Sequence, residues 1–226
     1  MSNHLLTGAG SGIGAVLAER LLERGDTLVL LARSAERAHD LRADLPGATV
    51  LVADLADPAS VEAVAGDLPE SLDSVVHAAG VVDLGPVASL STADWQSQLA
   101  VNLVAPAVLT RVALPALRAA RGTVVFVNSG AGLVAHPEWS AYAASKHGLR
   151  ALADSLRGEE LAHGVRVTSV YPGRTATPMQ QRVHDQEGKD YDASAWIDPG
   201  TVVDAVLHVL DLPDDATVID LTIRPR

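Results

Sequence analysis

The chain has 226 residues, of which 48% are hydrophobic and 20% are charged, and its formal net charge is −11 at pH 7. This length and composition are typical of one soluble globular domain with a large core, and we expect residues 1–226 to form it. The acidic balance and the lack of a basic stripe argue against nucleic-acid binding. The absence of cysteine excludes disulfides, thiolate metal sites and thiol catalysis, and no other metal-ligand pattern is present.

The first residues lack a basic region followed by a long apolar run, so a secretory signal peptide is not predicted. The most apolar long stretch, residues 101–120, is interrupted by Pro106, Arg111, Pro115 and Arg118. We therefore do not interpret it as a membrane span, and we expect a cytoplasmic protein without a membrane partner.

Short apolar runs rich in β-branched residues alternate along the chain with longer segments of helical periodicity. We expect strands at residues 4–6, 27–32, 49–52, 74–77, 123–128, 166–170 and 218–221. We expect helices at residues 12–24, 35–45, 58–66, 92–119, 140–162 and 199–210. This alternation predicts an α/β fold with a doubly wound sheet of about seven mostly parallel strands and helices on both faces. Residues 175–197 form the only long polar stretch without such a pattern, and we expect an irregular lid over a site there.

The first predicted strand is followed by Thr7 and a run of closely spaced glycines, Gly8, Gly12 and Gly14, before a predicted helix. Glycines at such a turn let the backbone approach a pyrophosphate, which meets the unpaired N–H groups of the helix N-terminus. The spacing T-G-x-x-x-G-x-G, set between a strand and a helix, predicts a dinucleotide site.

Tyr142 and Lys146 are spaced i, i+4, so both side chains lie on one face of a helix. Lysine is scarce in this chain: only Lys146 and Lys189 are present among 17 basic residues. An ammonium near a phenol favours the phenolate and makes tyrosine a usable general acid or base. One cation at ~4 Å, at an effective dielectric of ~20, supplies the roughly 4 kcal/mol needed to bring a phenol to a pKa near 7.

With these motifs the chain resembles the short-chain dehydrogenase/reductase family, in its compact single-domain branch. Further landmarks of that family occur in order along the chain: Asp54-Leu55, Asn102, Ser129, Tyr142, Lys146, and Pro172-Gly173 with Thr177. One departs from the family, because His77-Ala78-Ala79-Gly80 stands where N-N-A-G is common. The missing Asn removes a side-chain hydrogen bond that is worth ~1 kcal/mol.

The resemblance implies a Rossmann-type fold and hydride transfer between a nicotinamide and a carbonyl or alcohol carbon. It implies that Tyr142 is the general acid/base, that Lys146 holds the nicotinamide ribose and lowers the pKa of the tyrosine, and that Ser129 hydrogen-bonds the substrate oxygen. Asn102 then anchors a water that passes protons to Lys146. The cofactor-binding residues implied are Gly8, Ser11, Gly12, Ile13, Gly14, Arg33, Ser34, Asp54, Leu55, Ala79, Gly80, Asn102, Tyr142, Lys146, Pro172, Gly173, Thr175 and Thr177.

The end of the second strand, Leu31-Ala32-Arg33-Ser34, lacks the acidic residue that accepts from the ribose hydroxyls in NAD enzymes of this fold. Arg33 and Ser34 are suited to bind a 2′-phosphate, and Arg37 is a weaker candidate. We therefore expect NADP(H) to be preferred over NAD(H).

Trp139, Met179 and Trp196 flank the predicted site, and we expect them to line a pocket for a small, largely apolar ketone, aldehyde or secondary alcohol. His136, His147 and His163 have no acid or nucleophile at useful spacing and are interpreted as surface or packing residues. Two alternatives remain open: a ketoreductase acting on acyl-carrier-protein substrates, which requires Arg111, Arg118 and Arg121 to form a docking patch, and a non-catalytic cofactor-binding sensor. Predicted helices 92–119 and 140–162 carry surplus apolar surface, so we expect a homo-oligomer, a tetramer or a dimer.

Overall fold

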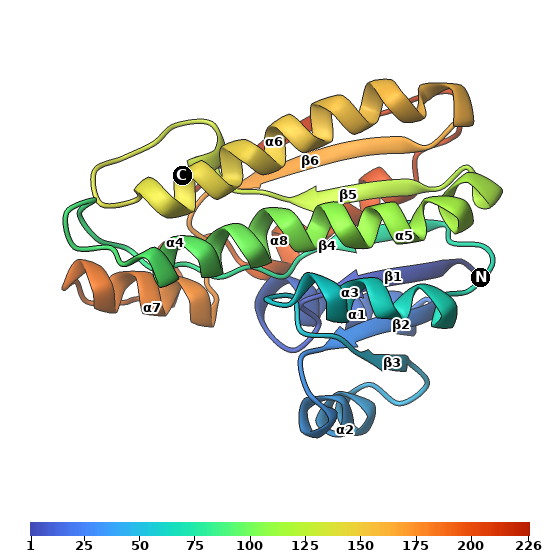
Figure 1. Cartoon of the computed structure of the whole chain (residues 1–226), viewed down its shortest axis with the longest axis horizontal. Helices are drawn as coiled ribbons and strands as arrows, with labels where there is room; N and C mark the ends of the chain where they lie inside the picture. Colours follow the sequence, from blue (N-terminus) through green and yellow to red (C-terminus); the bar gives the residue numbers. More distant parts are fainter.

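The computed structural model describes all residues 1–226 and contains one seven-stranded sheet in the order β3-β2-β1-β4-β5-β6-β7 (Figure 1). Every neighbouring pair of strands is parallel. The strands are β1 (Asn3–Thr7), β2 (Thr27–Ala32), β3 (Thr49–Val52), β4 (Ser74–His77), β5 (Thr123–Val127), β6 (Arg166–Pro172) and β7 (Asp220–Ile223). The predicted α/β class and doubly wound sheet are confirmed, with the last strand beginning at Asp220 instead of residue 218.

Helices cover both faces of the sheet (Figure 1). One face carries α1 (Gly12–Glu23), α2 (Ala35–Asp44) and α8 (Pro199–Leu210), and the other carries α3 (Pro58–Ala63), α5 (Ala105–Ala120) and α6 (Ser140–Glu160). The strands supply apolar side chains to both layers: in β1, Leu5 packs into one core and Leu6 into the other, and both are fully buried. This is why the central strands read as continuous apolar runs.

The predicted helix at residues 92–119 is divided by a π-helical turn. Helix α4 (Thr92–Leu99) leads into the turn Ala100–Val104, and α5 continues from it. Pro106, near the start of α5, supplies no N–H to the carbonyl of Asn102, so one regular helical hydrogen bond is missing at this turn. The combined run Thr92–Ala120 has the length and composition of a membrane span, but in this fold it packs on the sheet and buries Leu109, Ala113 and Leu117 completely.

Residues 175–197 are not irregular as expected, because the segment contains α7 (Pro178–Glu187) and a short 3₁₀ turn, Ala193–Ala195; its role as a lid stays a prediction. Thr177 caps α7 by accepting from the N–H of Gln180 at 3.3 Å, Pro178 begins it, and Gly188 ends it in the left-handed conformation. The buried face of this helix is made of Gln180, Val183 and His184. Because two of these residues are polar, the sequence shows no apolar residues at helical spacing here.

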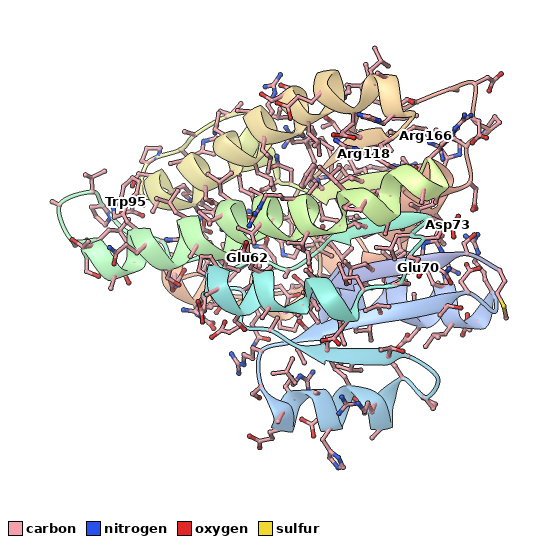
Figure 2. All side chains as sticks on the ribbon, turned by 45° about the vertical axis from the view of Figure 1, so that its right-hand side comes forward. Glu62, Glu70, Asp73, Trp95, Arg118 and Arg166 are labelled. Atoms are coloured by element: carbon pink, nitrogen blue, oxygen red, sulfur yellow. The ribbon has the colours of Figure 1, made fainter.

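The carboxyl and amino ends of the strands have different surroundings. Helices α4 and α7 extend past the carboxyl ends of the strands (Figure 1). Figure 2 shows Trp95 of α4 at this end of the molecule, with Glu70, Asp73 and Arg166 at the opposite end. Because ligands of open parallel sheets bind at the carboxyl ends of the strands, the site is expected on the side of α4 and α7.

Candidate functional site

A single large cavity of about 1180 Å³ opens at the carboxyl ends of the strands. Its wall runs from the turn between β1 and α1, past the ends of β4 and β5, to α7. Of the predicted cofactor-binding residues, all but Gly14, Ser34 and Asn102 line it. The tertiary fold therefore gathers residues from the whole length of the chain around one space.

The glycine turn lies at one end of this cavity. Gly8 and Gly12 have φ angles of +79° and +56°, a region that favours glycine. A Cβ on Gly8 would lie 2.7 Å from the backbone nitrogen of Ala79, and one on Gly14 would lie 2.3 Å from the carbonyl oxygen of Gly8. Ser11 caps α1 without a side-chain hydrogen bond, and no acidic residue stands in the first turn. No side chain therefore accepts from the first N–H groups of α1, which are directed to the cavity. Such unpaired N–H groups can donate to a pyrophosphate.

At the end of β2, Arg33 is exposed and lines the cavity. Ser34 instead caps α2, because its hydroxyl accepts from the N–H of Arg37 at 3.2 Å. The guanidinium of Arg37 reaches back and donates to the carbonyl of Gly10 at 2.9 Å, so it joins α2 to the glycine turn. Arg37 also pairs with Asp40 at 3.4 Å, whereas Arg33 makes no ion pair with an acidic side chain, and a free guanidinium there fits an anionic group on the adenosine side of a dinucleotide.

Ser129, Tyr142 and Lys146 meet at the middle of the cavity. Ser129 follows β5, and its hydroxyl accepts from the N–H of Ala131 at 3.1 Å. Tyr142 and Lys146 are 6% and 3% exposed on the first turns of α6. The ammonium of Lys146 donates to the carbonyl of Val127 at 3.1 Å and lies 5.8 Å from the centre of the Tyr142 ring.

Burial controls the pKa values of this pair. Burial lowers the pKa of Lys146 to about 8. Burial also raises the pKa of Tyr142 above its usual value, and the neighbouring Ser129 hydroxyl opposes the rise. The sequence had suggested a lowered phenol pKa from an ammonium at ~4 Å. The structure gives the opposite direction, because the desolvation of the buried phenol prevails.

Asn102 lies beneath the cavity in the π-helical turn, not in its wall. Its amide oxygen accepts from the N–H of Val81 at 2.8 Å, and its amide nitrogen donates to the carbonyl of Val81 at 2.9 Å and to the hydroxyl of Ser145 at 3.0 Å. A Cβ on Gly80 would lie 3.3 Å from this amide oxygen and 3.8 Å from the ammonium of Lys146. Asn102 therefore links the loop after β4 to the helix that carries Tyr142 and Lys146.

His77, the departure from the family pattern, is buried at the end of β4. Its ring stacks on Phe126 at 5.0 Å, and its Nε2 pairs with the hydroxyl of Thr110 at 2.8 Å. Burial, with a contribution from the charge of Lys146, lowers the pKa of His77 to about 3. His77 is thus a neutral packing residue that joins β4 to α5.

The far end of the cavity is built from aromatic and charged residues together. Trp139 stands edge-on to Tyr142 at 5.8 Å, and Met179 also lines the wall. Arg174 lies 5.9 Å from the ring centre of Trp139 and 5.4 Å from that of Trp196, and it pairs with Glu187 at 2.6 Å. Trp196 does not line the cavity; it packs behind Arg174 and against His184.

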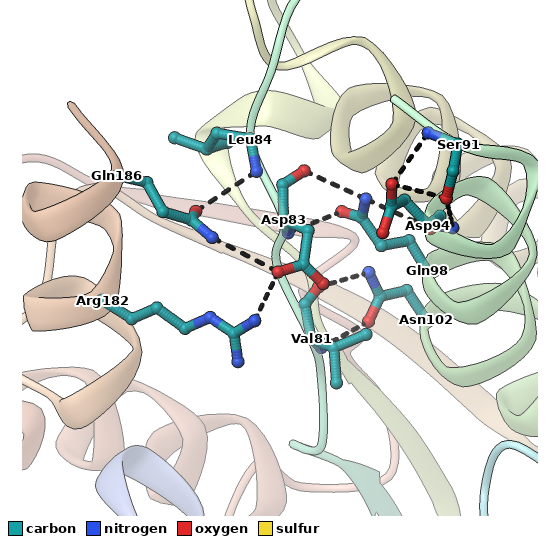
Figure 3. A network of polar contacts seen from close by, with 9 residues as sticks. All are labelled: Val81, Asp83, Leu84, Ser91, Asp94, Gln98, Asn102, Arg182 and Gln186. Carbon is teal, nitrogen blue, oxygen red and sulfur yellow. Dashed lines mark hydrogen bonds and ion pairs between the residues drawn. The ribbon is translucent and has the colours of Figure 1, made fainter. Parts of the chain in front are cut away.

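Helix α7 is joined to the loop after β4 by a polar network (Figure 3). The carboxylate of Asp83 accepts from Arg182 and from Gln186, the latter at 3.3 Å. On the other side of the loop, the amide of Gln98 pairs with both the N–H and the carbonyl of Asp83, at 3.2 and 3.0 Å. One short loop therefore connects α7 with the segment that holds Asn102.

Residues Arg174, Glu187 and Arg224 were missed as site residues from the sequence, although all three line the cavity. Arg174 lies between Gly173 and Thr177, at an unspecified position of the P-G-x-x-x-T motif. Its place inside that motif could have indicated that it lines the site. No local pattern points to Arg224, which follows the last strand.

A parallel sheet with a glycine turn at a helix N-terminus and a Ser, Tyr and Lys set at its carboxyl edge defines a dinucleotide-dependent oxidoreductase. A family model described as short chain dehydrogenase matches residues 3–188. The chain belongs to the short-chain dehydrogenase/reductase family and is an oxidoreductase of that family.

Named relatives agree with this assignment. An uncharacterized oxidoreductase of Staphylococcus epidermidis is 28% identical over 98% of this chain and 96% of its own length. A D-threitol dehydrogenase of Mycolicibacterium smegmatis is 35% identical over 80% of this chain and 73% of its own length. Among solved structures, an alcohol dehydrogenase from Thermococcus sibiricus complexed with 5-hydroxy-NADP has a TM-score of 0.86 and 26% identity, and the match covers 100% of this chain and 97% of that one.

Proposed function

We propose that the protein is an NADP(H)-dependent oxidoreductase that interconverts a small, largely apolar ketone or aldehyde and its alcohol. The observation that carries this proposal is the position of Ser129, Tyr142 and Lys146 in one cavity whose other end is the glycine turn of α1. A reacting carbonyl beside Ser129 and Tyr142 then lies between the cofactor end and the aromatic end of the same space.

The nicotinamide cofactor, when bound, supplies or accepts the hydride. The hydroxyls of Ser129 and Tyr142 donate hydrogen bonds to the substrate oxygen, where negative charge develops during reduction. Because burial raises the pKa of Tyr142, the phenol is protonated at neutral pH and is ready to act as a general acid. Lys146, with a pKa of about 8, is largely cationic at pH 7 and stabilises the phenolate that forms when the proton leaves.

The cofactor preference rests on Arg33. Its exposed guanidinium lines the cavity after β2, where NAD enzymes of this fold place a carboxylate. A guanidinium there binds a 2′-phosphate and provides no acceptor for the free hydroxyl of NAD. The NADP analogue bound in the Thermococcus alcohol dehydrogenase and the NADH bound in a similar 4-hydroxyisoleucine dehydrogenase support a nicotinamide dinucleotide as the cofactor.

The carrier-protein alternative is not favoured. It required a free basic patch, but Arg111 pairs with Glu62 at 2.7 Å and Arg118 pairs with Glu160 at 2.6 Å. The sensor alternative is disfavoured because Asn102, Ser129, Tyr142 and Lys146 are all present.

The direct test is NADPH oxidation with a panel of ketones and aldehydes, using the protein and its Tyr142→Phe variant. We expect turnover by the parent and a loss of about 10²- to 10⁴-fold in the variant, which removes the proton donor. Binding of NADPH should be retained by the variant, as measured by cofactor fluorescence. Equal turnover by both proteins would refute the role of Tyr142, and tight cofactor binding without turnover of any compound would favour the sensor.

A homo-oligomer, a tetramer or a dimer, is also part of the proposal. Only 39% of the most apolar window of Thr92–Ala120 is buried in the single chain, which leaves apolar surface for a second copy. Light scattering coupled to size-exclusion chromatography measures the mass directly, and a monomer at micromolar concentration would contradict this expectation.

A further inference from the structure

The cavity wall has more basic than acidic residues, whereas the whole chain has more acidic than basic ones. The whole chain has 17 basic and 28 acidic residues. The cavity is lined by the cations Arg33, Arg37, Lys146, Arg174 and Arg224 and by only two carboxylates, Asp54 and Glu187. A cleft with an excess of one charge concentrates ligands of the opposite charge, so this cavity attracts anions.

Four of these cations already have a role. Arg33 and Arg37 stand at the glycine-turn end, and Lys146 holds the carbonyl of Val127 beside Tyr142. Arg174 is paired with Glu187 at 2.6 Å, a carboxylate that also pairs with Lys189 at 3.1 Å. Arg224, like Arg33, is exposed and makes no ion pair with an acidic side chain, but it stands away from the glycine-turn end. At the substrate end Lys146 is buried and Arg174 is paired with Glu187, so Arg224 is the exposed cation there without an acidic partner.

The fold places Arg224 beside the reacting groups. Strand β7 ends at Ile223, whose carbonyl accepts from the N–H of Gly173 at 2.7 Å, so Arg224 begins next to the end of β6. Its guanidinium then reaches over Gly130: a Cβ on that glycine would lie 2.7 Å from Nη1 of Arg224. Gly130 directly follows Ser129, so the absence of a side chain there lets the cation approach the residue that faces the substrate oxygen.

Besides the paired Arg174 and Glu187, the substrate end has an apolar wall. Val82, Trp139, Met179 and Val183 line the cavity around Tyr142. A ligand that matches this wall has an apolar body with one negative group directed toward Arg224. A single guanidinium fits a carboxylate monoanion through two parallel hydrogen bonds, whereas a phosphate monoester carries about two charges at neutral pH.

We propose that Arg224 selects substrates that carry a carboxylate, so that the reacting compounds are apolar hydroxy acids and the corresponding oxo acids. This inference rests on the proposed function and names the substrate class of that same site. Arg224 is a specificity-determining residue in this assignment, and it takes no part in hydride or proton transfer.

The test compares kcat/KM for 2-, 3- and 4-hydroxy acids with kcat/KM for their methyl esters, following NADP⁺ reduction by the parent chain. Hydroxyalkyl phosphates of matched length form a third arm. We expect at least one acid to exceed its ester by about 10- to 100-fold, the range of a charge-assisted hydrogen bond. In Arg224→Gln this acid-to-ester ratio should collapse toward one, and Arg224→Lys should restore part of it.

Arg226→Gln is the matched control, because Arg226 lies two residues farther along the same exposed segment and does not line the cavity. The control should keep the parental ratio. Equal use of acids and esters, an unchanged ratio in Arg224→Gln, or a preference for the phosphates would each overturn the carboxylate assignment while leaving the proposed oxidoreductase activity standing. Failure to oxidise any alcohol, neutral or charged, would refute the proposed function and this inference with it.

Discussion

Asp83 in the loop after β4 forms an ion pair with Arg182 of α7 (Figure 3). The two side chains are 28% and 61% exposed, and ion pairs in such surroundings contribute about 0–1 kcal/mol. The same loop is bonded to Gln98 and, through Val81, to Asn102. Helix α7, which lines the cavity, is thus connected to the segment that holds Asn102 by contacts of which the Asp83–Arg182 pair is weak.

Replacing Asp83 with Ala should loosen α7. The loss of one partly exposed ion pair predicts up to about fivefold faster amide exchange in residues 178–187 and a higher KM for the substrate, with a smaller change in kcat. Hydrogen–deuterium exchange measures the first effect and steady-state kinetics the second. Asp185→Ala is the control, because Asp185 is exposed on the same helix and its side chain has no bonded partner. Unchanged exchange in α7 would show that Asp83 does not hold it.

Arg33→Ala should affect the KM for NADPH and the KM for NADH differently. We expect KM for NADPH to rise by about 10-fold or more, the value of a charge-assisted hydrogen bond, while KM for NADH changes little. Arg37→Ala provides the comparison, because its guanidinium donates to Gly10 of the glycine turn and its loss should weaken both cofactors alike. Equal losses for both cofactors in Arg33→Ala would count against a 2′-phosphate site.

The pH dependence of carbonyl reduction should follow Lys146. Burial lowers its pKa to about 8, so the ammonium is present below that pH and is lost above it. Single-turnover reduction should therefore be fastest near neutral pH and decline as the pH rises through about 8. In Lys146→Arg the guanidinium stays charged, and any remaining activity should no longer decline in this range. A decline at the same pH in that variant would assign it to another group.

His77 should make the protein sensitive to acid. Its pKa is about 3 in the folded chain and ~6.5 when unfolded, so the unfolded state binds the extra proton as the pH falls below ~6.5. Between pH 7 and pH 5 the parent should lose about 2 kcal/mol more unfolding free energy than His77→Gln does. Urea unfolding at the two pH values measures this difference. His39→Gln, at an exposed histidine of α2, should retain the parental pH dependence; an identical loss in His77→Gln would contradict the assignment.

Trp139→Ala should change substrate selectivity. The indole stands edge-on to Tyr142 and forms part of the cavity wall, so its removal should alter relative kcat/KM values across a ketone panel and raise KM for the bulkier apolar members. Trp95→Ala is the matched control, because Trp95 lies on α4 outside the cavity wall (Figure 2). Unaltered relative rates in Trp139→Ala would remove this residue from the pocket.

Local chemistry in the sequence determined the class of fold, the glycine turn and the Tyr142–Lys146 pair. These features depend on contacts within a few residues: strand periods, the left-handed backbone of Gly8 and Gly12, and one turn of a helix. The helix α7 was not recognised, because its buried Gln180 and His184 gave no apolar period.

Only the tertiary structure decided how residues from distant segments meet. The π-helical turn places Asn102 against Val81, and burial reverses the expected shift of the Tyr142 pKa. Arg224 reaches Gly130 because β7 pairs with β6, a contact between strands far apart in the chain. Desolvation and long-range pairing depend on the whole packed molecule, and no local pattern of residues records them.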